Sequence, residues 1–290
     1  MLKSIIFDLD GTLWQTSDSY LYAYRKLCEF YNVTDRFSDE DILSCLGVKL
    51  DVFLPKLFPN VIDQRELAIR AMRYSIEYLL DNPDSCCYRG VAQMLEALSK
   101  KHSIYIVSNC LDAYVETFLK ISDTANFIKG YYTLQSGEKQ EHIKKIVALN
   151  EGKALLVGDS DDDRTAIENN FEVLFCYAAY GYKSCSSYAY KIDEPMQLIG
   201  VVDKIEEKER QLTGKPYCVI SNCDNQLTLM RNSDGSEYFG FVRCVDEGFD
   251  AVVKELVAHS KGNFLLGPIN GNTFYNYLLR SDNYKKCCRL

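Results

Sequence analysis

The chain has 290 residues, of which 47% are hydrophobic and 26% are charged, a balance typical of a globular protein with one large or two modest domains. Its formal net charge of −8 argues against a nucleic-acid-binding surface, which needs concentrated positive charge. No apolar run approaches the length of a membrane span, and the N-terminal residues do not resemble a signal peptide. We therefore expect a cytoplasmic protein that binds neither membranes nor nucleic acid.

The sequence contains 12 cysteines, and none of them stands in a Cys-x-x-Cys pair. This spacing does not predict a zinc site, and without a secretory signal we expect reduced thiols. The last four residues, Cys287 to Leu290, formally fit a C-a-a-X prenylation box. Arg289 stands where an aliphatic residue is wanted, so a basic tail is the favoured interpretation.

The first predicted strand covers residues 4–7 and ends at two carboxylates followed by a glycine. Asp8 and Asp10 are two positions apart, and Gly11 lets the chain leave the strand sharply. A carboxylate pair at the end of a buried strand is costly unless positive charge lies beside it. A hard divalent cation, most often Mg²⁺ with a phosphate, would supply that charge. A solvated Asp-rich turn is the alternative interpretation.

Residues 15–85 are predicted to be mostly helical. Helix-starting signals occur at Ser17-Asp18 and at residues 38–41, where Ser-Asp-Glu-Asp supplies a cap and an acidic first turn. We expect this second helix to end near Gly47. The spacing of apolar residues predicts that the first of these helices covers about 17–30, and it predicts another long helix over about 62–80. We interpret the segment as a helical insert between the first strand and the rest of the domain.

From about residue 89 the predicted elements alternate between helix and strand. Strands are expected over 104–107, 130–134, 154–157 and 173–177, and helices over 91–100, 111–121, 143–149 and 165–170. This alternation predicts an α/β fold with a parallel, doubly wound sheet.

Polar side chains follow several of these strands at the point where each strand ends. Asp8, Ser108 and Asp159 each follow a strand, and Lys139 stands at the end of a loop over 136–139. The carboxyl ends of parallel strands lie along one edge of a sheet, where ligands bind. We therefore expect these residues to converge on one crevice.

These residues resemble the motifs of the haloacid dehalogenase (HAD) superfamily of phosphatases, in particular its phosphoglycolate-phosphatase-like branch. The matching segments follow the family's order and are Asp8 to Thr12, Ser108-Asn109, Lys139 and Gly158 to Asp163. The resemblance covers about residues 1–206. It implies a Rossmann-like core formed by 1–14 and 86–206, with a helical type-1 cap over 15–85. A cap over the crevice favours small phosphate esters and disfavours proteins as substrates.

The resemblance also implies roles in catalysis and phosphate binding. Asp8 would attack phosphorus and form an aspartyl phosphate. Asp10 would protonate the departing alcohol and then take a proton from the attacking water, a role that halide-releasing dehalogenases do not need. The phosphate would be bound by Ser108, Asn109 and Lys139.

For the metal, the resemblance implies Mg²⁺ held by Asp8, the backbone carbonyl of Asp10, and Asp159. Asp163 would be a supporting acid near the metal. Asp161 and its neighbour Asp162 are equally consistent with an acidic helix N-terminus.

Residues 207–290 are predicted to form a small α+β module after a boundary at Lys204–Pro216. Strands are expected over 217–221, 238–243 and 264–266, with a helix over 248–260. This order resembles part of a GNAT acetyltransferase fold but has no glycine-rich pyrophosphate loop. A docking module for a protein partner or for self-association is therefore favoured over a second enzyme.

Three functions follow from these observations. The first is Mg²⁺-dependent hydrolysis of a small phosphorylated metabolite through an aspartyl phosphate. The second is a phosphomutase-like transfer, in which the phosphoryl group passes to a sugar instead of to water. The third is a binding or scaffold protein that acts through its GNAT-like C-terminal module. The sequence does not name the substrate.

Overall fold

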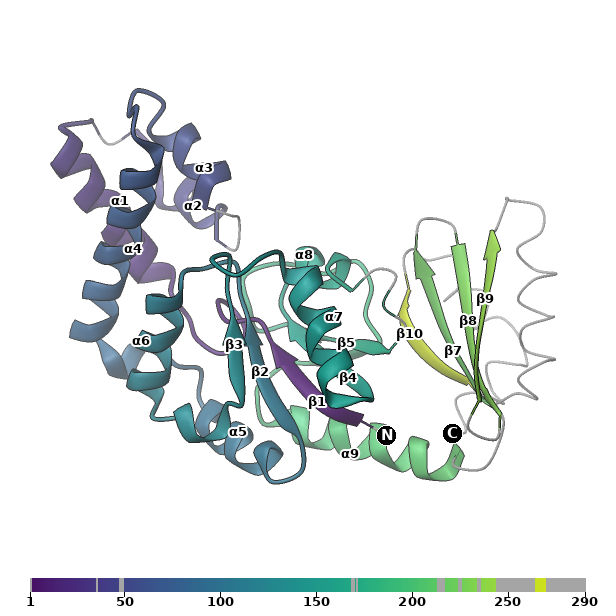
Figure 1. Ribbon diagram of the computed structural model, residues 1–290. Helices are drawn as coiled ribbons and strands as arrows, with labels where there is room; N and C mark the ends of the chain where they lie inside the picture. Colours follow the sequence, from purple (N-terminus) through teal and green to yellow (C-terminus); the bar gives the residue numbers. More distant parts are fainter. Residues whose placement is uncertain are drawn as a thin grey trace.

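The computed structural model describes residues 2–34, 36–46, 50–167, 170, 172–212, 217–223, 226–233, 236–243 and 264–269. A six-stranded sheet with the order β3-β2-β1-β4-β5-β6 lies at its centre (Figure 1). All neighbouring strands in this sheet are parallel. The strands are β1 (Leu2–Phe7), β2 (Ser103–Val107), β3 (Gly130–Tyr132), β4 (Lys153–Gly158), β5 (Val173–Ala178) and β6 (Tyr190–Ile192). The predicted parallel α/β sheet is confirmed.

Helices cover both faces of the sheet, which explains why its strands are continuous apolar runs. Ile5 and Phe7 of β1 point to one face, where they pack with α5 (Val91–Ser99), α6 (Asp112–Ser122) and α9 (Gln197–Leu212). Ile6 points to the other face and packs with α7 (Lys139–Asn150). The short helix α8 (Asp161–Thr165) follows β4. Because the central strands are buried on both faces, their carboxyl ends are held in fixed positions.

The predicted helical insert lies between β1 and β2 and has an apolar core of its own. It comprises α1 (Ser17–Tyr31), α2 (Asp39–Leu43), α3 (Leu50–Leu57) and α4 (Gln64–Asp81). Figure 1 shows these helices grouped to one side of the sheet. Leu27 of α1, Phe53 of α3 and Leu67 of α4 pack together in this core. Met72 of α4 packs instead in the core of the sheet, so the insert and the sheet are in contact.

Several boundaries differ from the sequence prediction. The N-cap of α1 is Thr16 rather than Ser17-Asp18, whereas Ser38 caps α2 as expected, through a capping box with Asp41. The expected end of that helix, Gly47, lies outside the described residues. Helix α3 was not predicted, because Pro55 in its interior argues against a helix on propensity alone.

Two helices next to the predicted site also begin earlier than expected. Helix α7 begins at Lys139, so this residue belongs to the first helical turn and not to a loop. Helix α8 covers 161–165 rather than 165–170, because a capping box between Ser160 and Asp163 starts it directly after β4. Strand β6 and helix α9 were also not predicted.

A second sheet follows α9. It has four strands in the order β10-β7-β8-β9, with β10 parallel to β7 and the other pairs antiparallel. The strands are β7 (Tyr217–Cys223), β8 (Gln226–Ser233), β9 (Ser236–Arg243) and β10 (Phe264–Ile269), of which β8 was not predicted. Helix α9 continues to Leu212, so most of the expected Lys204–Pro216 boundary is helical. The expected helix over 248–260 lies outside the described residues.

None of the described helices combines the length and the apolar content that crossing a bilayer requires.

Candidate active site

The predicted site residues meet at the carboxyl ends of β1, β2 and β4. The Asp8 N–H donates to the carbonyl of Val157 at 2.9 Å, and the Ser108 N–H donates to the carbonyl of Tyr132 at 3.1 Å, which continues the strand pairing into the site. One cavity, of about 480 Å³ including its open mouth, is lined by all the residues singled out in the sequence: Asp8, Asp10, Ser108, Asn109, Lys139, Asp159 and Asp163. The predicted convergence on one crevice is therefore observed.

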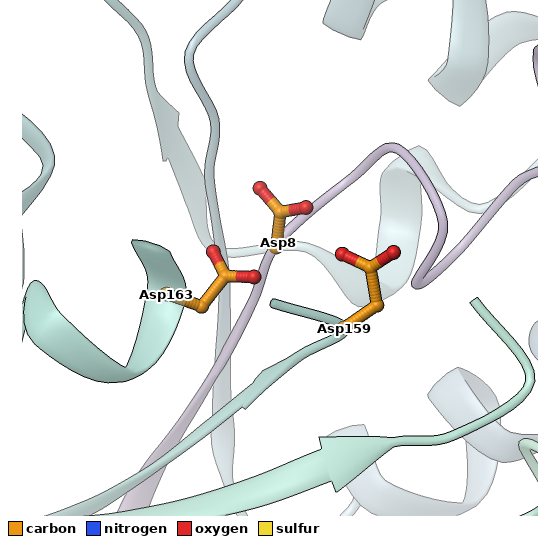
Figure 2. Close-up of side chains that lie close together, drawn as sticks. All are labelled: Asp8, Asp159 and Asp163. Carbon is orange, nitrogen blue, oxygen red and sulfur yellow. The ribbon is translucent and has the colours of Figure 1, made fainter. Parts of the chain in front are cut away.

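Three buried carboxylates form the centre of this cavity. Oxygens of Asp8, Asp159 and Asp163 lie within 4.8 Å of one another, and Figure 2 shows the three side chains facing a common space. Burial, followed by repulsion from Asp163, raises the pKa of Asp8 well above its ordinary value. The same two causes raise the pKa of Asp159 to about 7. A group of this kind can hold a metal ion, because a cation would offset the repulsion that raises both pKa values.

Lys139 is the counter-ion of two of these carboxylates. Its Nζ lies 2.6 Å from Oδ1 of Asp8 and 2.6 Å from Oδ1 of Asp163. Burial alone would lower the pKa of Lys139, but the attraction of Asp163 and Asp8 outweighs it and raises that pKa. A cation in the first turn of a helix is disfavoured by the helix dipole. The carboxylates therefore account for the position of this side chain at the start of α7.

Asp163 is held from two sides. Its Oδ2 accepts hydrogen bonds from the Ser160 hydroxyl at 2.7 Å and from the Ser160 N–H at 3.2 Å, and its Oδ1 binds Lys139. Gly158 makes room for it, because a Cβ at that position would lie 2.5 Å from the Asp163 carboxyl carbon. Both oxygens of Asp163 are thus engaged, which leaves Asp8 and Asp159 better placed to bind a metal directly.

Asp10 has a different environment from Asp8, because neutral donors surround it. Its Oδ1 accepts hydrogen bonds from Thr16 Oγ1 at 2.7 Å, from the Tyr114 hydroxyl at 2.9 Å and from Trp14 Nε1 at 3.0 Å. Burial raises the pKa of Asp10 although these hydrogen bonds act to lower it. Because Oδ1 already accepts three hydrogen bonds, Oδ2 is the oxygen that can carry a proton. None of these three donors was predicted, because no local pattern in the sequence marks them as neighbours of Asp10.

The loop after β5 holds Asp159 and was also missed. The Tyr182 N–H donates to Oδ2 of Asp159 at 2.7 Å. A Cβ on Gly181 would lie 2.3 Å from the Asp159 Cβ, and a Cβ on Gly11, whose φ is 78°, would lie 2.3 Å from Oδ2 of Asp159. The two glycines thus let the chain close around this carboxylate. A glycine between two tyrosines, directly after a buried strand, was the only hint of this loop in the sequence.

Besides Ser160 and Asp162, which follow Asp159, three further residues line the cavity. Tyr20 of α1 and Met72 of α4 line it, so the helical insert contributes to the site itself. Cys110 also lines it, and burial raises the pKa of its thiol. The sequence analysis had assigned none of these residues to the site, because each of them is equally consistent with a place in an apolar core.

The order and geometry of these groups agree with a match to a known family. Residues 5–173 match the model of the haloacid dehalogenase-like hydrolases. The chain belongs to this family. The match covers β1, the helical insert and the sheet as far as the start of β5, and so includes each of the carboxylates described above.

Two relatives of the chain have phosphatase names. A phosphoglycolate phosphatase of Aquifex aeolicus is 28% identical over 218 residues, which are 70% of this chain and 97% of that protein. A pyrophosphatase, PpaX, of Anoxybacillus flavithermus is 27% identical over 169 residues, which are 56% of this chain and 77% of that protein.

Solved structures show the same fold. A predicted phosphoglycolate phosphatase of Haemophilus somnus superposes with a TM-score of 0.59 at 19% identity, covering 69% of this chain and 98% of that one. The HAD-hydrolase YfnB of Bacillus subtilis, described as bound to magnesium, superposes with a TM-score of 0.54 at 15% identity, covering 70% of this chain and 99% of that one.

Proposed function

We propose that the protein is a Mg²⁺-dependent phosphatase that hydrolyses a small phosphate monoester through an aspartyl phosphate on Asp8. The observation that carries this proposal is the contrast between two aspartates two positions apart. Asp8 contacts Lys139 and faces further carboxylates, whereas Asp10 is held by neutral donors. One carboxylate is thus arranged as a nucleophile beside a charge-balancing cation, and the other as an acid and base. The phosphatase names of the relatives support the same reaction.

The residues present fit a magnesium ion. Among the described residues that line the cavity there are five aspartates, and Lys139 is the one cation. Hard carboxylate oxygens of this kind suit Mg²⁺. We propose Asp8, Asp159 and the backbone carbonyl of Asp10 as its ligands, with Asp163 as the supporting acid. The bound ion would supply the positive charge that lets a carboxylate approach a phosphate dianion.

The proposed reaction has two steps at phosphorus. In the first, a carboxylate oxygen of Asp8 attacks phosphorus, the bond from phosphorus to the alcohol oxygen breaks, and Oδ2 of Asp10 gives its proton to that oxygen. In the second, Oδ2 of Asp10 takes a proton from water, whose oxygen attacks phosphorus and releases phosphate from Asp8. Lys139, Ser108 and Asn109 would hold the phosphate oxygens during both steps.

We propose residues 1–14 and 86–206 as the core domain and 15–85 as its cap. Tyr20 and Met72 of the cap line the cavity, which supports a restriction to small substrates. Residues 207–290 extend beyond the family match, which ends at residue 173. We propose them as a separate module that binds a protein partner or a second copy of the chain. Light scattering of the full chain during size-exclusion chromatography tests the second option.

A phosphate-release screen tests the proposed function. The panel contains sugar phosphates, phosphoglycolate, nucleotides and pyrophosphate, each with and without Mg²⁺. We expect turnover with Mg²⁺, no turnover by Asp8→Asn, and loss of most of the rate but not of metal binding in Asp10→Asn. Asp123→Asn, a substitution at the exposed residue that ends α6 and does not line the cavity, is the charge-matched control. A fully active Asp8→Asn variant, or no turnover of any substrate, would refute the proposal, and phosphate transfer that requires an added sugar would indicate a mutase.

A further inference from the structure

Tyr182 contacts two parts of the site, one through its backbone and the other through its side chain. Its backbone N–H donates to Oδ2 of Asp159 at 2.7 Å. Its hydroxyl lies 3.1 Å from Oγ1 of Thr16 and also accepts a hydrogen bond from the Thr16 N–H. Thr16 is 166 positions away from Tyr182 in the sequence, whereas Asp159 is 23 positions away. The side chain of Tyr182 therefore ties the loop after β5 to the start of α1.

The direction of these hydrogen bonds follows from the number of protons available. The Thr16 hydroxyl has one proton, which it donates to Oδ1 of Asp10 at 2.7 Å, because a carboxylate can only accept. A hydrogen bond between Thr16 Oγ1 and the Tyr182 oxygen can then use only the Tyr182 proton, for which the Tyr88 hydroxyl is a second partner. A tyrosine hydroxyl carries its proton at neutral pH and can therefore donate it. The result is an ordered chain from Tyr182 through Thr16 to Asp10.

Thr16 gives up its usual role to take part in this chain. It is the N-cap residue of α1, a position where a threonine hydroxyl normally accepts from a backbone N–H of the first turn. Here the Thr16 side chain makes no such cap bond. Its hydroxyl bonds to Asp10 instead, and its own N–H bonds to Tyr182. The helix forgoes a local stabilising interaction for contacts that fix Asp10.

We propose that Tyr182 is a positioning residue for proton transfer by Asp10. Its hydroxyl fixes the Thr16 hydroxyl, which occupies Oδ1 of Asp10 and leaves Oδ2 to carry the proton. This inference rests on the proposed function, in which Asp10 protonates the leaving alcohol. Because the same residue holds Asp159 through its backbone, removing the hydroxyl separates the two contacts and leaves the Asp159 contact intact.

The test compares Tyr182→Phe with Tyr180→Phe. Tyr180 lies in the same loop, but its hydroxyl donates to the backbone carbonyl of Thr12 at 2.8 Å and takes no part in the chain to Asp10. The kcat/KM of each variant is measured with a simple alkyl phosphate, whose alcohol needs protonation to leave, and with 4-nitrophenyl phosphate, whose leaving group does not. We expect Tyr182→Phe to lower kcat/KM for the alkyl ester about tenfold, which is less than the 10²–10⁴-fold that the acid itself supplies because Asp10 is still present. We expect little effect with the nitrophenyl ester.

The Mg²⁺ affinity of Tyr182→Phe is expected to equal that of the wild type, and Tyr180→Phe is expected to show no dependence on the leaving group. An equal loss with both esters, or no loss with either, would overturn the inference while leaving the proposed phosphatase intact. Failure of the wild type to hydrolyse any ester would count against the proposed function instead.

A second measurement does not depend on activity. Tyr182→Phe is expected to lower the Tm of the wild type by about 2–4 °C and to lower that of Asp10→Ala by clearly less, because residues in one hydrogen-bond network are not additive. Additive shifts in Tm would overturn the inference, whatever the enzyme assays show.

Discussion

Replacing Asp159 with asparagine is expected to stabilise the metal-free protein at alkaline pH. Burial, and then repulsion from Asp163, raises the pKa of Asp159 to about 7 from an ordinary value of 3.8. The unfolded chain therefore loses this proton near pH 4, whereas the folded protein keeps it until about pH 7. Between these values the folded state binds more protons, so its stability falls as the pH rises.

The size of the effect follows from the same two values. A tenfold change in proton affinity corresponds to about 1.4 kcal/mol, so keeping the Asp159 carboxylate ionised in the folded protein costs about 4 kcal/mol at pH 8. An asparagine carries no charge, and its Oδ1 can still accept the hydrogen bond that the Tyr182 N–H makes with Asp159. We expect Asp159→Asn to be more stable than the wild type by about 4 kcal/mol at pH 8 and by less than about 1 kcal/mol at pH 4.

Urea unfolding in the presence of EDTA measures this difference. Trp14 is the single tryptophan of the sequence and is fully buried, so its fluorescence reports the unfolding of this core. The control is Asp123→Asn, because Asp123 is exposed and ends α6 at φ 52°, a conformation that asparagine also adopts. An Asp159→Asn variant that is no more stable than the wild type at pH 8, or whose advantage is the same at pH 4, would refute the reasoning. Saturating Mg²⁺ should reduce the advantage, by about 2.7 kcal/mol at 100 times Kd, because the ion stabilises the wild type preferentially.

Three other predictions concern the same cavity. Lys139→Met is expected to lower kcat by about 10²-fold or more in the phosphate-release assay, because Asp8 and Asp163 lose their shared counter-ion. A kcat near that of the wild type would contradict the role of Lys139 as this counter-ion. Gly181→Ala is expected to weaken Mg²⁺ binding about tenfold in titration calorimetry, because the alanine Cβ would lie 2.3 Å from the Asp159 Cβ. An unchanged Mg²⁺ affinity would show that the loop can move without displacing Asp159. Removal of metal with EDTA is expected to abolish phosphate release and added Mg²⁺ to restore it, so that full activity in EDTA would exclude the proposed cofactor.

The helices of the insert show where a local sequence pattern is sufficient to predict an element and where it is not. The cap at Ser38 and the apolar stripe of α4 are each encoded by residues only a few positions apart, so the sequence predicted both. Helix α3 depends on burial of Phe53 and Leu54 against the other helices of the insert, which outweighs the proline in its interior. That packing is a tertiary effect with no local signal.

The sequence by itself determined which strand ends carry the chemistry. Alternating helices and strands impose a parallel sheet, and a parallel sheet brings the residues after β1, β2 and β4 to one edge, whatever the details of packing. Only the tertiary structure decided what each aspartate contacts. Tyr114 reaches Asp10 across 104 positions, and Lys139 reaches Asp8 across 131. Contacts over such separations depend on how whole layers pack, and the residues that make them have no distinguishing pattern in their own neighbourhoods.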